Sequence, residues 1–326
     1  MTRLLILIVA AALAWSGYWA VAAWQLRQAQ EDWFAARRAD GWQAAYADLA
    51  VRGFPNRLDS TFTDVALADP ESGLAWRAPL FQMLRLSYRP NHVIAAWSGP
   101  QTLATPERRA TVESERMRAS LVLRSGAPRA LDRATFVAEG VRVVPETGGA
   151  WALARLNAAA ERTAASAARY RLGLSLDGLA PPGAPERLPQ TLEAVRLDAT
   201  VTFDAPWDAA AVAGRRPQPE LIEIDAAEAR WGDLRLSAQG RLEVDAAGVP
   251  EGRIDLRAEN WRAILRLAET AAPLPPGLTE TLEEALALAA GLSGDPETLD
   301  LPLAVTAGQL RLGPVPLGPA PRLLIR

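Results

Sequence analysis

The sequence contains no cysteine and no lysine, and it has a single histidine, His92. The absence of cysteine excludes disulfides, thiol nucleophiles, iron–sulfur clusters and cysteine-bound zinc. The absence of lysine excludes Schiff-base chemistry and a phosphate-binding loop lysine. With one histidine, metal sites built from three histidines are also impossible. We therefore assign no catalytic residue, and we expect no metal and no cofactor.

The charge of the chain is balanced. Its 326 residues include 35 basic and 38 acidic side chains, which gives a formal net charge of −3 at pH 7. The arginines are interleaved with Asp and Glu, whereas nucleic-acid-binding proteins concentrate positive charge on one surface. We therefore expect no nucleic-acid partner.

The first segment of the chain predicts a membrane helix. Residues 4–24 are an uncharged run of 21 residues, which as an α-helix spans about 30 Å, the thickness of the hydrocarbon core of a bilayer. Aromatic rings in the second half of the run are typical of membrane–water interfaces. We assign residues 1–24 as an N-terminal transmembrane anchor, whose anchor residues are Leu4, Trp15, Trp19 and Trp24.

Two alternatives concern this segment. A cleaved signal peptide is the competing interpretation, because Arg3 gives a charged start and Ala-x-Ala motifs lie at residues 12–14 and 20–22. For the orientation, the arginines that follow the run outnumber Arg3, which favours a cytoplasmic domain. A hydrophobic segment so close to the N-terminus is instead typical of a signal-anchor that exports the following domain. We predict a single-pass anchor in the inner membrane, with the C-terminal domain in the periplasm.

Residues 25–52 are predicted to form a juxtamembrane helical segment. Trp42, Tyr46 and Leu49 have the spacing of one helix face, and Asp40-Gly41 before them predicts a break, with Asp40 as the cap of the second piece.

Beyond this segment the apolar residues alternate, for example in residues 120–124 (SLVLR) and 172–176 (LGLSL). Such alternation predicts strands with one buried and one polar face. The proline-rich residues 179–189 separate a first β-rich half, residues 53–178, from a second, residues 190–326.

The second half contains a repeat of glycine, polar, aliphatic, polar and aliphatic residues, which begins at Gly232, Gly240, Gly252 and Gly308. We expect each glycine to supply a turn or a bulge. The first three copies are predicted to be successive strands of a curved antiparallel meander, with a turn at residues 245–248.

Two helices are predicted near the end of the chain, one after Asn260 as its cap and one over residues 279–292, with prolines between them at positions 273, 275 and 276. The predicted fold class is therefore mainly β, a β-rich α+β protein. An N-terminal transmembrane helix is followed by curved antiparallel sheets with a few bracing helices.

Four motifs follow one another along the chain: GFPNR at residues 53–57, GLAWRAP at 73–79, YRPNH at 88–92 and GQLRLGPVPLG at 308–318. Together with the anchor and the repeat, their order resembles a bacterial envelope family known as domain of unknown function 2125, over essentially the whole chain. The resemblance implies an exported, membrane-anchored protein without an assigned reaction. The paired-strand repeat is also similar to that of AsmA-like envelope proteins, whose curved sheets carry lipid between membranes.

The side chains that could carry chemistry are few. His92 is interpreted as a hydrogen-bonded structural residue at the start of a strand, because no neighbouring serine has the context of a nucleophile elbow. The spacing of the acidic residues considered for calcium does not fit a twelve-residue calcium loop. These residues are Asp204, Asp208, Asp245 and Glu251.

Three functional hypotheses follow. The leading one is a non-enzymatic protein whose curved sheet offers an apolar groove to a lipid or an acyl chain, with ligand-binding residues that the sequence does not identify. The second is an envelope scaffold or protein-interaction module. The third is a hydrolase that uses His92. The expected partners are the inner membrane and, under the first two hypotheses, a lipid or another envelope protein.

Overall fold

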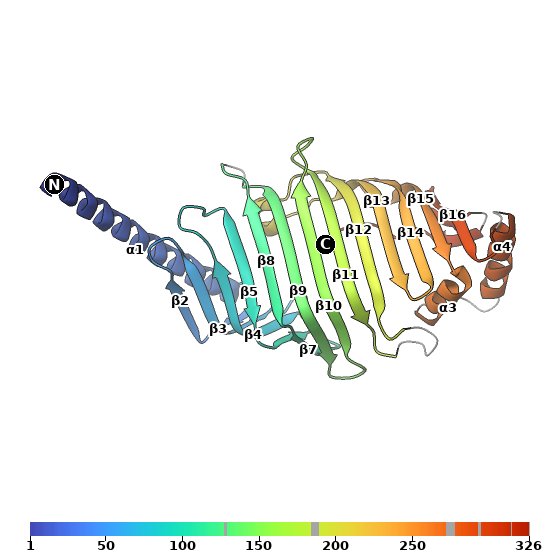
Figure 1. Ribbon diagram of the computed structural model, residues 1–326, viewed down its shortest axis with the longest axis horizontal. Coiled ribbons are helices and arrows are strands. Elements are labelled where there is room, and N and C mark those ends of the chain that lie inside the picture. The colour runs from blue at the N-terminus through green and yellow to red at the C-terminus, as the bar shows by residue number, and fades with distance from the viewer. Residues whose placement is uncertain (127–128, 184–188, 272–277, 293–294, 314, 326) are drawn as a thin grey trace. The chain divides into compact units, whose positions relative to one another are not determined.

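The computed structural model describes residues 1–126, 129–183, 189–271, 278–292, 295–313 and 315–325. It confirms the predicted fold class, because a long N-terminal helix is followed by antiparallel sheets and a few short helices (Figure 1). The chain divides into two compact units. Unit 1 comprises Met1–Ser125 and Ala134–Leu153, and unit 2 comprises Gly126–Arg133 and Ala154–Arg326.

Unit 1 consists of helix α1 and an antiparallel sheet. Strands β2, β3, β4, β5 and β8 are successive neighbours in this sheet, while β1 pairs with β3 and β6 pairs with β4 and β7. Its elements are α1 (Thr2–Ala39), β1 (Gln43–Ala45), β2 (Asp48–Arg52), β3 (Asp59–Ala68), β4 (Ala75–Leu84), β5 (His92–Ser98), β6 (Gln101–Ala104), β7 (Arg109–Glu113), β8 (Arg116–Leu123) and most of β9 (Leu131–Pro145).

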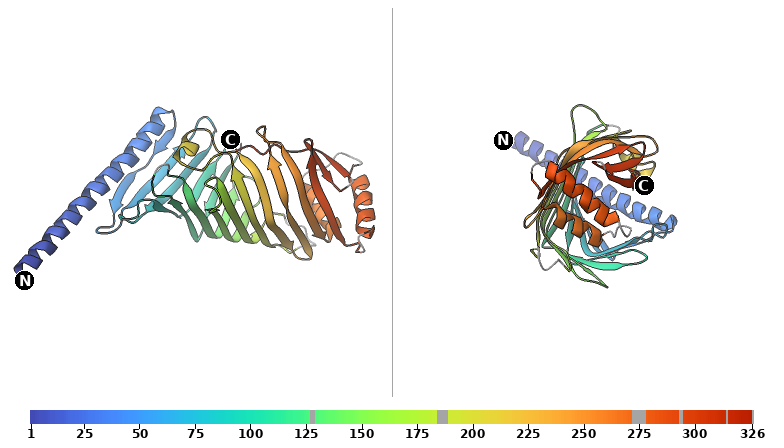
Figure 2. Two further views of the ribbon diagram at one scale, coloured as in Figure 1. Left: turned by 90° about the horizontal axis from the view of Figure 1, so that it is seen from above. Right: turned by 90° about the vertical axis from the view of Figure 1, so that its right-hand side faces the viewer.

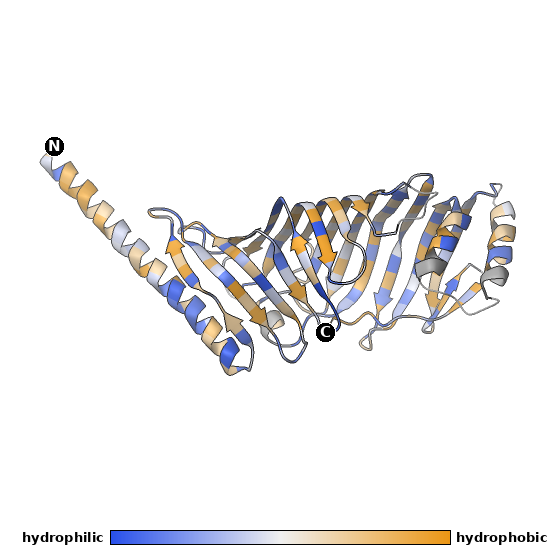
Figure 3. Ribbon diagram, turned by 90° about the horizontal axis from the view of Figure 1, so that it is seen from below, coloured by the Kyte–Doolittle hydropathy of each residue, from blue (hydrophilic) through white to orange (hydrophobic). Residues whose placement is uncertain are grey.

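Helix α1 is continuous across the predicted anchor and the first part, residues 25–39, of the predicted juxtamembrane segment. It ends at the predicted break, where Gly41 has a positive φ of 86° and the amide of Asp40 donates to the Ala36 carbonyl. Its first half is apolar and its second half carries most of its charges (Figure 3). Among the described residues, α1 is the one helix long and apolar enough to span a membrane.

The predicted helix beyond Asp40 is wrong. Residues 43–45 and 48–52 form β1 and β2 instead, so Asp40 caps no second helix. Trp42, Ala44 and Tyr46 also have the spacing of one strand face, and the side chain of Ala44 is buried in the core of unit 1. Pairing with β3 decided between the two periodicities.

Unit 2 is an antiparallel meander in which β11 to β18 pair in chain order. Its elements are most of β10 (Trp151–Arg162), β11 (Arg169–Ala180), β12 (Leu192–Phe203), α2 (Ala209–Ala213), β13 (Pro219–Trp231), β14 (Leu234–Val244), β15 (Pro250–Glu259), α3 (Trp261–Ala271), α4 (Leu278–Leu292), β16 (Thr298–Thr306), β17 (Gln309–Leu312) and β18 (Val315–Pro319). The described residues of the proline-rich stretch, 179–183 and 189, belong to this unit, and the division into two β-rich halves stays a prediction.

Both predicted helices near the end of the chain are confirmed. Helix α3 begins directly after Asn260, and α4 begins at Leu278, one residue before its predicted start. They pack against the end of the sheet through the buried side chains of Trp261, Leu282 and Leu286 (Figure 2). The prolines at positions 273, 275 and 276 lie outside the described residues.

The repeat is built differently from the expected meander. The turn at residues 245–248 joins β14 and β15 as predicted, but Gly240 lies within β14, so the first two copies share one strand. A Cβ at Gly240 would lie 2.3 Å from the carbonyl oxygen of Arg253, and one at Gly252 would lie 2.2 Å from that of Arg241. These two glycines therefore permit a close approach of β14 and β15 and do not reverse the chain.

We expect Gly252→Ala to lower the free energy of unfolding of the protein by about 2–4 kcal/mol, because it combines a backbone clash with a φ of +143°. Thermal unfolding of the detergent-solubilised protein, followed by circular dichroism, measures the effect. The matched control is Gly173→Ala in β11, where a Cβ meets nothing within 4 Å. Equal stability of the two variants would contradict the close-approach explanation.

Candidate functional site

An apolar groove lies between α1 and the β3–β4 hairpin of unit 1. Its volume is about 410 Å³, within the usual range of small-molecule sites. The second half of α1 forms one wall and the two strands form the other. The lining residues are Leu26, Ala29, Gln30, Trp33 and Phe34 from α1, and Phe62, Val65, Leu67, Trp76, Phe81 and Met83 from the strands.

The pairing register of β3 and β4 collects the apolar side chains on one face. Phe62 lies opposite Phe81, and Leu67 lies opposite Trp76. Asp64, with a φ of 48°, has no partner in the ladder. Pro79, opposite it, is unpaired as well, and the pairing register is the same on both sides of this position. The ladder is therefore irregular in both strands here, and residues on both sides of the irregularity line the groove.

Aromatic rings form the floor of the groove. Phe34 is only 4% exposed, and its ring lies 4.8 Å from that of Tyr46 and 5.6 Å from that of Phe62. The row continues across the sheet, with 6.1 Å from Phe62 to Phe81 and 5.4 Å from Phe81 to Trp97. These centroid distances are typical of stabilising aromatic contacts, so the floor is formed by mutually packed side chains.

Gln30 is the one polar side chain among the lining residues, and none of them titrates. Its Nε2 lies 3.9 Å from Met83 Sδ, while its Oε1 is buried without a hydrogen-bond partner among the described residues. The groove therefore offers apolar surface, and its lining residues include no general acid or base.

The predicted anchor residues lie on the N-terminal half of α1. The side chains of Leu4 and Trp24 are exposed, as is most of the apolar run. Trp15 and Trp19 also contact the turn before β3, since their indole N–H groups donate to the carbonyls of Pro55 at 2.8 Å and Arg57 at 2.6 Å. No sequence pattern predicted these two hydrogen bonds, and the role of all four residues in the membrane stays a prediction.

His92 begins strand β5, and its Nε2 lies 2.9 Å from Ser120 Oγ on the adjacent strand β8. This hydrogen bond between neighbouring strands agrees with the interpretation of His92 as a structural residue. It joins two strands of the sheet, and neither residue lines the groove.

The carboxylates considered for calcium do not converge. Asp204 accepts a hydrogen bond from the backbone amide of Gln218, Asp208 caps helix α2, and Asp245 accepts from the amide of Ala247 in its own turn. Among the residues described, no group of three or more His, Asp or Glu side chains could hold a metal ion.

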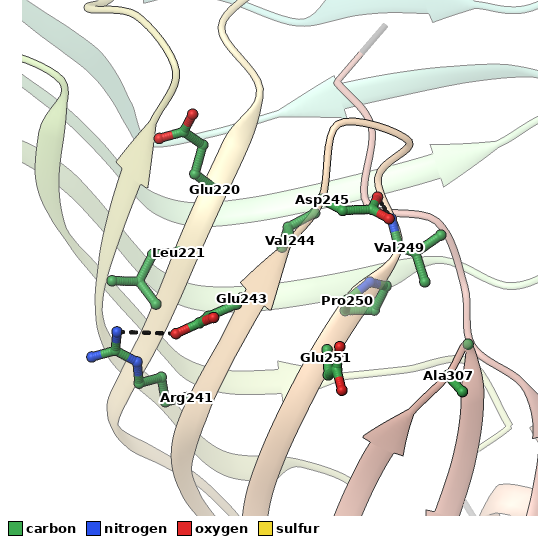
Figure 4. Close-up of a pocket in the computed structure, with 11 residues that line it drawn as sticks. Glu220, Leu221, Arg241, Glu243, Val244, Asp245, Val249, Pro250, Glu251 and Ala307 are labelled. Atoms are coloured by element: carbon green, nitrogen blue, oxygen red, sulfur yellow. Dashed lines mark hydrogen bonds and ion pairs between the residues drawn. The ribbon is translucent and has the colours of Figure 1, made fainter.

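Glu251 lines a polar depression in unit 2 of about 640 Å³, formed by β13, β14, β15 and the turn before β17 (Figure 4). Its one arginine, Arg241, pairs with Glu243 at 3.3 Å and with Glu223 at 3.5 Å. This arginine is thus already compensated, whereas the groove of unit 1 has uncovered apolar walls.

Comparison with protein families gives one match. Residues 19–321 match a family described as "Uncharacterized protein conserved in bacteria (DUF2125)". The chain belongs to this family. The matched region of this DUF2125 protein includes every residue that lines the groove. No curated protein and no solved structure matches the chain, so the similarity of its repeat to AsmA-like proteins stays a prediction.

We expect Phe34→Ala to destabilise unit 1 by about 3–5 kcal/mol, because it removes a buried ring from the contact of α1 with the sheet. Trp33→Ala on the same helix should cost less, since the Trp33 ring is 46% exposed. Limited proteolysis at residues 40–47, between the helix and β2, measures the loosening. A smaller effect for Phe34→Ala than for Trp33→Ala would contradict this assignment of the core contact.

Proposed function

We propose that this DUF2125 protein is a single-pass, membrane-anchored periplasmic protein that holds the acyl chain of a lipid in the groove between α1 and the β3–β4 hairpin. The observation that carries the proposal is the continuity of α1. The same helix provides the apolar run and then, from Leu26 onward, one wall of the groove. An acyl chain that leaves the bilayer along α1 meets apolar surface two residues beyond Trp24.

The chemistry of the groove favours a hydrocarbon over a polar ligand. Each methylene that moves from water into apolar surroundings contributes about 0.8 kcal/mol, and ten of the eleven lining side chains are apolar. The half-exposed ring of Trp33 and the exposed Ala29 lie on the helix wall, where a bound chain covers them.

The periplasmic location rests on the position of the apolar run. A hydrophobic segment that begins at residue 4 supports export of the sequence that follows it. The inner membrane and a lipid are the partners that this function requires. The hypothesis of an envelope scaffold stays a prediction beside it.

Ala29→Trp fills the groove, and we expect it to weaken the binding of a fluorescent fatty acid by about 15- to 60-fold, which corresponds to the displacement of two or three methylenes. The matched control is Ala35→Trp, the same exchange at an exposed position on the opposite face of α1. Fluorescence titration of the full chain in nanodiscs measures both affinities.

Lipid extraction followed by mass spectrometry gives an independent measurement on the same preparations. Wild-type protein and Ala35→Trp should retain an acyl lipid that Ala29→Trp lacks. Saturable binding that is equal in the three proteins would contradict the groove as the site, and the absence of binding in all three would contradict the proposed function.

A reporter fused after Arg326 tests the location. We expect alkaline phosphatase at this position to be active and green fluorescent protein to be dark, because the first folds in the periplasm and the second in the cytoplasm. The opposite pair of results would place the domain in the cytoplasm and overturn the periplasmic part of the proposal.

A further inference from the structure

Two loops at one end of the unit 1 sheet hold α1 in the middle of its apolar run. They are residues 53–58, between β2 and β3, and residues 85–91, between β4 and β5. In addition to the hydrogen bonds of Trp15 and Trp19 with the first loop, the hydroxyl of Tyr18 donates to the Ser87 carbonyl at 3.2 Å. Both loops are therefore fixed to the part of α1 that is predicted to lie in the membrane.

The length of free helix decides where these loops lie. Fourteen residues precede Trp15, the first contact, and they correspond to about 21 Å of helix. The hydrocarbon core of a bilayer is about 30 Å thick. A helix that crosses this core therefore holds Trp15 about 9 Å inside the hydrocarbon edge and Trp19, about 6 Å further along, close to that edge. The loops bound to these two residues lie at the boundary between hydrocarbon and headgroups.

The loops expose aromatic side chains, which favour the boundary between hydrocarbon and headgroups. Phe54 is 56% exposed and Tyr88 is 57% exposed. The Phe54 ring packs edge-on against Trp19, with 5.6 Å between the centroids, and Tyr88 follows the residue that binds Tyr18. Aromatic rings in such positions favour the interface between hydrocarbon and headgroups, so the loops extend the aromatic surface of α1.

The charge around the loops is positive. Residues 52–59 and 84–92 contain four arginines and one carboxylate, Asp59, which pairs with Arg57 at 2.7 Å. No carboxylate in the described part of the chain pairs with the half-buried Arg85, whose Nε is buried without a hydrogen-bond partner. Burial lowers the pKa of this guanidinium. A phosphate oxygen is the ligand that an unpaired arginine prefers at a membrane surface.

We propose that the two loops, together with Tyr18 and Trp19, form a membrane-binding surface that inserts into the headgroup region of a bilayer containing anionic phospholipids. Phe54 and Tyr88 enter the interface, and Arg85 and Arg89 bind lipid phosphates. The inference rests on the proposed anchoring by α1 and is independent of acyl-chain binding in the groove. It explains how the groove reaches the membrane, since Met83 of its lining precedes Arg85 by two residues.

The absence of native cysteine permits a direct test with the full chain in vesicles that contain phosphatidylglycerol. Single variants Phe54→Cys and Tyr88→Cys carry an environment-sensitive fluorophore. The control is Glu71→Cys, in the exposed turn at the other end of the β3–β4 hairpin; the ten-residue strand β3 separates the two ends by about 33 Å.

We expect labels at positions 54 and 88 to be quenched by lipid-chain quenchers and protected from an aqueous quencher, and the label at position 71 to behave in the opposite way. Labels at 54 and 88 that are as accessible to water as the label at 71, in protein that floats with the vesicles, would overturn the inference and leave the anchor intact. Protein that does not float with the vesicles would overturn the anchor and this inference together.

The role of the arginines is tested by energy transfer from the label at position 88 to acceptor-labelled phosphatidylglycerol or phosphatidylcholine. We expect Arg85→Gln and Arg89→Gln each to lower the preference for the anionic lipid by about fivefold. Arg77→Gln, an exposed arginine toward the other end of β4, is the control and should leave the preference unchanged. An equal preference in all three variants and the wild type would overturn the assignment of the phosphate-binding residues.

Discussion

The packing of Phe34 against Tyr46 and Phe62 is the contact on which the organisation of unit 1 depends. It joins the one long helix to the β1–β2 segment and to β3 at once. Because α1 is a continuous rod, this contact also fixes the direction in which the apolar run leaves the sheet. The groove and the membrane-facing loops both follow from the way the helix lies on the sheet.

The helix uses its aromatic residues in two ways. In the second half, Phe34 is buried and supports the fold, while Trp33 stays half exposed beside the groove. In the first half, Trp15 and Trp19 direct their indole N–H groups to carbonyls of the β2–β3 loop. A polar N–H that enters an apolar environment needs an acceptor. The loop supplies that acceptor, and the rings remain at the surface of the helix.

The elements that depend on local patterns could be predicted from the sequence. The alternation of apolar residues predicted the strands, the apolar run predicted α1, and Asn260 marked the start of α3. The prediction failed where two periods fit the same residues, as at Trp42, Ala44 and Tyr46, and where a glycine serves a neighbouring strand, as at Gly240. In both cases the contact that determines the structure is made with a residue distant in sequence. A pattern read from neighbouring residues does not include such a contact.

The sequence by itself determined that this protein has a β-rich fold behind an apolar helix, and that cysteine, lysine and multi-histidine chemistry are excluded. Only the tertiary structure decided where an apolar ligand can bind. The groove requires the irregular ladder at Asp64, the register that sets Phe62 opposite Phe81, and the placement of α1 across both strands. Each of these is a pairing between segments far apart in the chain, and its free energy comes from surfaces that meet only after folding.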